Sequence, residues 1–388
     1  MPYVIGVDRT VWSVYFKPEV SSYKSSVYVT WTKNKMASSK EDSTTAAAKQ
    51  LGSMSLNRST ERNDENTKPI AKSGTPTKMC SVCEKKSDTL KKCRNCKCVW
   101  YCDKECQNKH WKDHRKECKL IKKELDKRGG KLDLGTEKDL GPLPDLPTKE
   151  ECPICMHALQ PSKQMSFYAL CCGKTICCGC SLQHQIKSKE QAVSLTCAFC
   201  RTTPPQSDEE IMVLRSKRIE LKDPTALCNM AIDYGLGGRG LSVDEAKCIE
   251  LLSESAGLDY PPAQFQLGNY YETGAMGLER STKEGLKYYE KAAEGGHLVA
   301  RHHVGCTAAI NGDLIAAMRH WQLSASAGMR KSMNVLIIFF RNGFLRHGDL
   351  AGTLQAFYCS RADMRSEGRD QYIAHLKRIG KYDEGFEY

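Results

Sequence analysis

Residues 1–79 of the 388-residue chain contain no cysteine, and the chain contains no long apolar run. The longest uninterrupted run, Val335–Phe340, has six residues, whereas a membrane-spanning helix needs about 20. The first 35 residues also lack the basic start, apolar core and small-residue cleavage site of a secretory signal. We therefore expect a soluble intracellular protein, cytoplasmic or nuclear, with no membrane partner.

Beyond residue 79, cysteine is abundant and unevenly distributed. Of the 21 cysteines, eight lie within 80–118, nine within 152–200 and four further on. In a reducing compartment, cysteines at short paired spacing indicate metal ligation rather than disulfides. The distribution therefore predicts two metal-folded modules, and the four later cysteines suit small core positions of another domain.

Positive charge is concentrated in the first cysteine-rich segment. The chain carries 58 Lys and Arg against 46 Asp and Glu, a net charge of +12. Residues 78–131 hold 18 of these cations and 8 of the acids, which accounts for most of the excess. A basic segment can bind nucleic acid, but these lysines are spread among the metal ligands without an aromatic platform. We expect solvated charge here and no nucleic-acid partner.

Composition along the chain predicts a mixed fold, in which two small zinc-stabilised modules precede an all-α solenoid. Alternating β-branched and aromatic residues predict short β segments within 1–35. The rest of the N-terminal region 1–78 is expected to be disordered because it is polar. The proline-rich stretch before residue 150 indicates a stiff linker. The predicted order is 79–119 first module, 120–150 helix tail and linker, 151–201 second module, 202–222 linker, 223–358 helical repeats and 359–388 C-terminal tail.

The first module has eight candidate ligands, in the order Cys80-x2-Cys83-x9-Cys93-x2-Cys96-x5-Cys102-x3-Cys106-x7-His114-x3-Cys118. Zinc takes four thiolate or imidazole ligands in a tetrahedron, so eight ligands make two sites. Each Cys-x2-Cys turn supplies two thiolates from one tight loop. The pairs Cys102/Cys106 and His114/Cys118 have the spacing that places two side chains on one face of a helix.

This module, including Cys106-Gln107, His110-Trp111 and His114, resembles the MYND zinc finger. The resemblance implies two interleaved structural zinc sites with these ligands: Cys80, Cys83, Cys102 and Cys106 for zinc 1; Cys93, Cys96, His114 and Cys118 for zinc 2. Cys98 lies outside the pattern, as a spare thiol or a substitute for a neighbouring ligand. MYND fingers bind short, often proline-containing peptides of partner proteins. Some lie within SET methyltransferases, but the flanks here do not have SET character.

The second module has the order Cys152-x2-Cys155-x15-Cys171-Cys172-x4-Cys177-x2-Cys180-x16-Cys197-x2-Cys200. It resembles an all-cysteine RING finger, with Lys174 at the position of the usual histidine ligand. The implied cross-brace uses these ligands: Cys152, Cys155, Cys177 and Cys180 for zinc 3; Cys171, Cys172, Cys197 and Cys200 for zinc 4. Adjacent ligands are geometrically awkward. The alternative is that Cys171 or Cys172 is spare and that His184 or Cys178 replaces it.

RING ligases recruit a ubiquitin-conjugating enzyme through an apolar groove and supply no catalytic residue themselves. By resemblance, Ile154, Phe199 and Arg201 would contact that enzyme. Ala198, where active RING fingers commonly have proline, and Lys174 argue against ligase activity. Many RING-like modules are interaction surfaces alone, so both interpretations remain open.

Internal repetition appears when the residues after 222 are aligned at a period of about 37 residues. One equivalent position holds small residues: Ala226, Ala263, Ala300 and Ser332. The second helix of each unit is predicted to begin at an N-cap residue: Asp244, Ser281, Asp313 and Asp349. Large apolar residues follow at the spacing of one helix face. The segment resembles Sel1-like repeats, relatives of the tetratricopeptide solenoid, which bind proteins on their concave face.

Three consecutive modules of interaction type predict a zinc-binding adaptor for protein–protein interactions, with about four structural Zn²⁺ ions. The expected partners are proteins or short, proline-containing peptides. The alternative is a RING-type ubiquitin ligase, in which the MYND finger or the repeats select the substrate. No residue is assigned a catalytic role.

Overall fold

The structure is a computed structural model that describes residues 3–7, 10–16, 27–30, 79–132, 140, 150–159 and 165–381. The chain divides into two units, Met1–Thr77 and Lys78–Tyr388. In the first unit, β1 (Tyr3–Val7), β2 (Thr10–Phe16) and β3 (Val27–Thr30) form an antiparallel sheet in chain order. The disorder predicted for 36–78 and the proline-rich linker lie outside the described residues.

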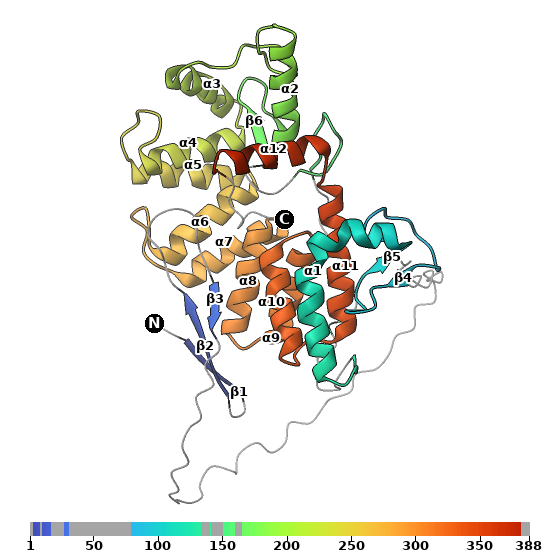
Figure 1. Cartoon of the computed structure of the whole chain (residues 1–388). Helices are drawn as coiled ribbons and strands as arrows, with labels where there is room; N and C mark the ends of the chain where they lie inside the picture. The colour runs from blue at the N-terminus through green and yellow to red at the C-terminus, as the bar shows by residue number, and fades with distance from the viewer. Residues whose placement is uncertain are drawn as a thin grey trace, which may run out of the picture. The chain divides into compact units, whose positions relative to one another are not determined.

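The second unit contains both cysteine-rich modules and a long run of helices (Figure 1). Its described strands form two antiparallel hairpins, β4 (Lys91–Lys92) with β5 (Trp100–Tyr101) and β6 (Ser166–Ala169) with β7 (Lys174–Cys177). The described helices are α1 (Lys104–Lys127), α2 (Cys178–Glu190), α3 (Asp208–Glu220), α4 (Pro224–Leu236), α5 (Glu245–Gly257), α6 (Pro261–Thr273), α7 (Thr282–Glu294), α8 (Leu298–Ile310), α9 (Leu314–Ser326), α10 (Arg330–Arg341), α11 (His347–Asp363) and α12 (Glu367–Arg378). None of these helices has both the length and the apolar composition needed to cross a membrane.

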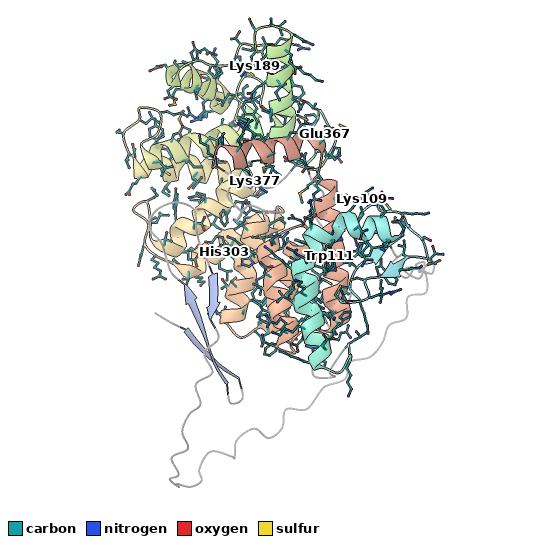
Figure 2. All side chains as sticks on the ribbon, viewed as in Figure 1. Lys109, Trp111, Lys189, His303, Glu367 and Lys377 are labelled. Atoms are coloured by element: carbon teal, nitrogen blue, oxygen red, sulfur yellow. The ribbon has the colours of Figure 1, made fainter. Side chains whose placement is uncertain are left out.

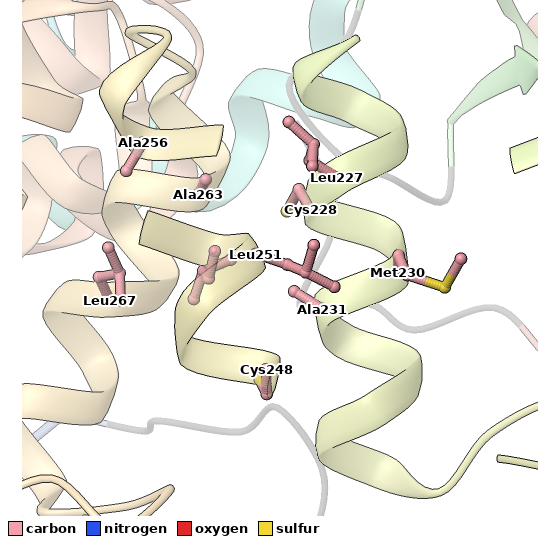
Figure 3. Packing of buried hydrophobic residues seen from close by; sticks show 10 residues of the cluster. Leu227, Cys228, Met230, Ala231, Cys248, Leu251, Ala256, Ala263 and Leu267 are labelled. Atoms are coloured by element: carbon pink, nitrogen blue, oxygen red, sulfur yellow. The ribbon is translucent and has the colours of Figure 1, made fainter. Parts of the chain in front are cut away.

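From α4 onwards, the helices pack as consecutive pairs. Helix α4 packs on α5, α6 on α7, α8 on α9 and α10 on α11, and each pair contacts the next. The equivalent small positions of the four units are all fully buried: Ala226, Ala263, Ala300 and Ser332. Figure 3 shows one interface, where Leu227, Leu251 and Leu267 come together from three successive helices. The predicted helical solenoid is confirmed.

The second helices of the repeats begin at the predicted caps, with one exception. Asp244, Ser281 and Asp313 each accept a hydrogen bond from a backbone N–H in the first turn. Such a bond satisfies a donor that has no partner within the helix. The prediction for Asp349 is wrong, because α11 already begins at His347. Asp349 lies in the first turn and accepts from Arg346 Nε at 3.1 Å.

Two segments that were predicted as connections contain helices. Within 202–222, residues 208–220 form α3, because Ser207 caps the helix and Met212 and Ile219 pack against the cluster of Figure 3. Within 359–388, residues 367–378 form α12, which packs on α2. Helix α3 packs on α4, which directly follows it in the chain, whereas α12 packs on a helix far away in the sequence.

Candidate metal centres

Four Cys-x2-Cys loops of the two modules share the same backbone turn. The residue after the second cysteine has a positive φ of 57–60°: Glu84, Lys97, Met156 and Arg201. Its N–H donates to the carbonyl of the first cysteine of the loop, at 2.8–3.1 Å. The turn closes each loop tightly, so that both of its sulfur atoms reach one cluster.

The start of α1 supplies further candidate ligands of the first module. Helix α1 begins after Asp103, whose carboxylate accepts a hydrogen bond from the Cys106 N–H at 2.8 Å. The predicted helical pairing of Cys102 with Cys106 is wrong, because Cys102 precedes this cap. Its Sγ nevertheless lies 3.3 Å from that of Cys106. His114 and Cys118 do share the buried face of α1.

In the second module, the β6–β7 hairpin and the start of α2 bring the remaining cysteines together. Cys171 and Cys172 lie in the turn between the strands. Cys177 ends β7, and its Sγ accepts a hydrogen bond from the Cys180 N–H in α2 at 3.3 Å. Helix α3 supports the turn, because the Arg218 guanidinium occupies the space that a Cβ would take at Gly173.

The described residues contain four sets of candidate ligands, and within each set the ligand atoms lie within 4.8 Å of one another. The sets are Cys80, Cys83, Cys102 and Cys106; Cys93, Cys96, His114 and Cys118; Cys152, Cys155, Cys177 and Cys180; Cys171, Cys172, Cys197 and Cys200. Each set has an Sγ–Sγ distance of 3.8 Å, in the pairs Cys80–Cys102, Cys93–Cys118, Cys155–Cys177 and Cys172–Cys197.

These donors and distances fit zinc. Thiolates at about 2.3 Å from a tetrahedral zinc lie about 3.8 Å from one another. Four protein donors complete the coordination of the ion, so each set suits a structural zinc rather than a catalytic one. We propose that each set ligates one zinc ion, as the sequence spacing suggests.

The first cysteine of each module has an environment that favours the thiolate. Burial opposes ionisation of Cys80, but backbone N–H groups of Cys83 and Cys102 stabilise its thiolate and lower its pKa to about 7. Burial likewise opposes ionisation of Cys152, and backbone N–H groups, led by that of Cys177, lower its pKa to about 7. The thiolate is the form that binds metal, so the environments of Cys80 and Cys152 favour ligation by these two residues.

Three further side chains considered as ligands lie outside the sets. Cys98 Sγ is buried 3.3 Å from His347 Nε2 of α11. Cys178 is buried at the start of α2, and burial raises the pKa of its thiol to about 11. His184 Nε2 lies 2.7 Å from the Thr196 carbonyl oxygen. None of the three is needed to complete a set of four.

The first module packs against the end of the repeat array, a contact that has no signal in the sequence. Helix α1 contacts α10. The side-chain amide of Gln355 in α11 donates to the Met79 carbonyl at 3.0 Å, and its oxygen accepts from Ser81 Oγ at 2.8 Å and from the Trp100 N–H at 3.4 Å. These residues are more than 250 positions apart in the chain, so only the fold brings them together.

The outward side of α1 is more basic than the composition of the helix suggests. Two of its acids point inward and are paired there, Glu117 with Arg330 at 2.8 Å and Glu124 with Arg128 at 3.3 Å. The exposed cations are Lys104, Lys109, Lys112, Arg115, Lys116, Lys119, Lys122, Lys123 and Lys127. Trp111 lies among them and is 37% exposed (Figure 2). We call this surface the cationic face of α1.

The second module exposes the side chains that were predicted to contact a conjugating enzyme. Ile154 lies within the first Cys-x2-Cys loop and is 45% exposed, and Phe199 lies within the last such loop and is 37% exposed. Arg201, which follows that loop, is also exposed. All three are accessible to a partner.

Two family matches agree with this organisation. Residues 80–118 match the MYND finger, and residues 224–260 and 261–297 each match the Sel1 repeat. A SET and MYND domain-containing protein of Dictyostelium discoideum is 58% identical over 33 residues, which is 8% of this chain and 6% of that protein. The histone-lysine N-methyltransferase ASHR1 of Arabidopsis thaliana is 52% identical over 44 residues, 11% of this chain and 9% of that enzyme. The chain thus spans less than a tenth of either relative.

Solved structures with similarity to the chain include repeat proteins. The Sel1 repeat protein of Oxalobacter formigenes is 25% identical, with 32% of this chain and 96% of that chain covered and a TM-score of 0.30. The c5321 antigen of uropathogenic Escherichia coli, which displays an SLR fold, is 18% identical, with 53% and 42% covered and a TM-score of 0.35. From the family matches, residues 80–118 form a zinc-binding MYND finger, and residues 224–297 form two Sel1 repeats.

Proposed function

We propose that this chain is a zinc-stabilised adaptor that joins proteins through its MYND finger, its RING-like second module and its repeats. MYND fingers and Sel1 repeats are protein-interaction modules. Complete coordination by protein donors leaves the metal a structural role, so function resides on the surface. The observation that carries the proposal is the cationic face of α1, which is exposed while the opposite face of the helix is buried.

The chemistry of this face indicates the kind of partner. Lys112, Lys116 and Lys119 are three or four residues apart, so they share one side of the helix. Their charge complements a segment rich in Asp and Glu. Trp111 beside them offers an aromatic surface of the kind that receives proline-rich segments. The partner that fits is therefore an acidic, proline-containing peptide of another protein.

Fluorescence anisotropy with the full chain tests this partner. The probes are a labelled proline-containing peptide with several glutamates, and the same peptide with glutamine at those positions. The acidic peptide should bind more tightly, and its binding should weaken as salt is added. Joint charge reversal by Lys112→Glu, Lys116→Glu and Lys119→Glu should lower its affinity about tenfold or more, and so should Trp111→Ala.

The matched control reverses three lysines of α7 in the repeats, Lys283, Lys287 and Lys291, and should leave the affinity unchanged. Equal binding of the acidic and neutral peptides would contradict the proposed partner. A DNA duplex is measured in parallel. If the duplex bound more tightly than the acidic peptide, nucleic acid would replace the peptide as the partner.

The alternative function is a RING-type ubiquitin ligase, favoured by the exposure of Ile154 and Phe199 on the loops of the second module. Those side chains would receive a ubiquitin-conjugating enzyme, with Arg201 beside them. Incubation with ubiquitin, activating enzyme and a panel of conjugating enzymes should then produce ubiquitin chains. Ile154→Ala should abolish the chains, whereas Leu236→Ala, at an exposed apolar position of the repeats, should not. If no conjugating enzyme of the panel produced ubiquitin chains, the ligase function would be contradicted and the adaptor function would stand without it.

A further inference from the structure

We propose that α11 and α12, the last two helices that the structure describes, support one metal site in each module. Tyr358 of α11 positions the ligand His114 of the MYND finger, and Arg369 of α12 stabilises the thiolate of Cys155 in the second module. Each acts through a hydrogen bond to a ligand, so both are positioning residues. The proposal rests on the ligand sets described above and is independent of the partner that the adaptor binds.

Tyr358 reaches the second ligand set of the MYND finger through the far side of the His114 ring. His114 Nε2 faces the set, 3.3 Å from Cys96 Sγ, and Nδ1 lies 3.2 Å from Tyr358 Oη. If Nε2 binds zinc, Nδ1 carries the proton, and the Nδ1–H group donates a hydrogen bond to Tyr358 Oη. A histidine ligand bound in this way has its tautomer and its ring direction defined.

Tyr358 is itself anchored by a buried chain of hydrogen bonds. Its hydroxyl donates to Glu117 Oε2 at 3.3 Å, and Glu117 Oε1 accepts from Arg330 Nη1 of α10 at 2.8 Å. Tyr358 and Glu117 are each 3% exposed. In addition, the tyrosine ring lies edge-to-face on His110, with centroids 4.1 Å apart. The helix pair α10 and α11 therefore determines the position of the Tyr358 hydroxyl relative to His114.

In the second module, Arg369 contacts a metal ligand as Tyr358 does in the MYND finger. Its Nη1 donates to the carbonyls of Ala158 at 2.7 Å and Met364 at 2.6 Å. Its Nη2 donates to the His157 carbonyl at 3.3 Å and lies 3.8 Å from Cys155 Sγ. Arg369 is only 1% exposed. A buried guanidinium is unfavourable unless its charge and its donors are matched, and among these acceptors a ligating Cys155 is the one with a charge.

The charge of the metal set favours a cation at this position. Four thiolates and one Zn²⁺ carry −4 and +2, a net −2, in the all-cysteine set of Cys155. The set that contains His114 has three thiolates and a net −1, and its neighbour is a neutral tyrosine. A hydrogen bond from a charged donor stabilises a thiolate or carboxylate acceptor more than a hydrogen bond from a neutral donor does. Of these two sets, the more negative one is thus the one that contacts arginine.

Close packing of α12 on α2 brings Arg369 to this place. A Cβ on Gly179 would lie 2.5 Å from both the Gly368 carbonyl carbon and the Arg369 nitrogen. Gly179 lies between Cys177 and Cys180, two members of the same metal set. The absent side chain lets the backbone of α12 approach the ligand loop, which places the guanidinium beside Cys155.

Chelator-driven zinc release from the full chain, followed by site-resolved thiol alkylation, tests both contacts. N-ethylmaleimide labels the cysteines of a set once its zinc has left, and peptide mass spectrometry identifies the set. Tyr358→Phe removes only the hydroxyl, and should speed labelling of Cys93, Cys96 and Cys118 about tenfold or more. Arg369→Met should speed labelling of the Cys155 set to a similar extent. Neither variant should change the other set.

Each variant is the control for the other. A further control is Tyr289→Phe, which also removes a buried tyrosine hydroxyl but far from the ligand sets, since Tyr289 Oη donates to Glu272 of the repeats at 2.6 Å. Arg369→Lys retains the charge and should recover part of the wild-type rate. Helicity measured by circular dichroism verifies that each variant is folded. Unchanged labelling in both variants, or equal acceleration of all four sets, would overturn the proposal.

Discussion

At the scale of single residues, His302 of α8 illustrates how burial changes a titrating group. Its Nδ1 lies 2.9 Å from Ser332 Oγ, and the side chain is 4% exposed. Burial, with a smaller effect of His303, lowers the pKa of His302 to about 3 in the folded chain, whereas an unfolded histidine has a pKa of about 6.5. Between these pH values the unfolded chain binds an extra proton, so stability falls as the pH falls.

Replacement of His302 by glutamine should reduce this pH dependence. Glutamine can still bond to Ser332 but does not titrate. The loss of unfolding free energy between pH 7 and pH 5 should therefore shrink by about 2 kcal/mol. Urea unfolding of the helical circular dichroism signal at both pH values measures the difference. The zinc content of each sample is determined as well, because acid also releases zinc. The same loss in variant and wild type would refute the effect.

The residues after the Cys-x2-Cys loops show how far residue type predicts backbone conformation. The spacing of the cysteines predicted which thiols pair in a loop. It did not reveal that Glu84, Lys97, Met156 and Arg201 adopt positive φ, since none is the glycine or asparagine that usually occupies this region. For other residues the left-handed region costs about 1–2 kcal/mol. The closed loop and its ligand set must offset that cost, and neither is visible in the local sequence.

At the scale of helices, glycines allow the repeat pairs to approach closely. A Cβ on Gly268 of α6 would lie 2.6 Å from the ring of Tyr289 in α7. A Cβ on Gly305 of α8 would lie 2.7 Å from Trp321 Nε1 in α9. Gly352 of α11, in contrast, has nothing within 4 Å of that position. The same residue type is thus required in one helix and dispensable in another.

Alanine at these glycines should act in opposite directions. Gly268→Ala should lower the free energy of unfolding by about 1–3 kcal/mol, because the methyl group overlaps Tyr289. Gly352→Ala should raise it by about 0.5–1 kcal/mol, because alanine restricts the unfolded chain and favours the helix. Thermal and urea unfolding, followed by circular dichroism, measure both changes. Stabilisation by Gly268→Ala would contradict the tight contact.

Helix α12 illustrates why some elements cannot be predicted from pattern. Its buried residues are Arg369 and Leu376, so it has no apolar stripe that would distinguish it from a polar tail. From the sequence, an arginine in such a polar segment is expected to be exposed to solvent. Its burial follows from the carbonyl groups and the thiol that the second module presents to it, which lie about 210 positions earlier in the chain.

At the scale of the whole chain, the four ligand sets predict the metal content. Native mass spectrometry of the full chain should find about four zinc ions, one for each set. Cys197→Ser removes one ligand from the last set and should lower the count by one. Two ions in the wild-type chain would show that one of the modules holds no metal, and the variant would then identify which one.

Most of the local chemistry follows from the sequence, apart from the Asp349 cap and the helical pairing of Cys102. The ligand spacings, the helix caps and the buried face of each repeat depend on residues a few positions apart, whose relative placement is set by backbone geometry. The contacts of Gln355 with Met79, Tyr358 with His114 and Arg369 with Cys155 join residues more than 200 positions apart. Such contacts form because the folded chain has buried groups that need partners. No local pattern encodes them, so the dependence of each metal module on the final helices emerges only from the packing of the complete fold.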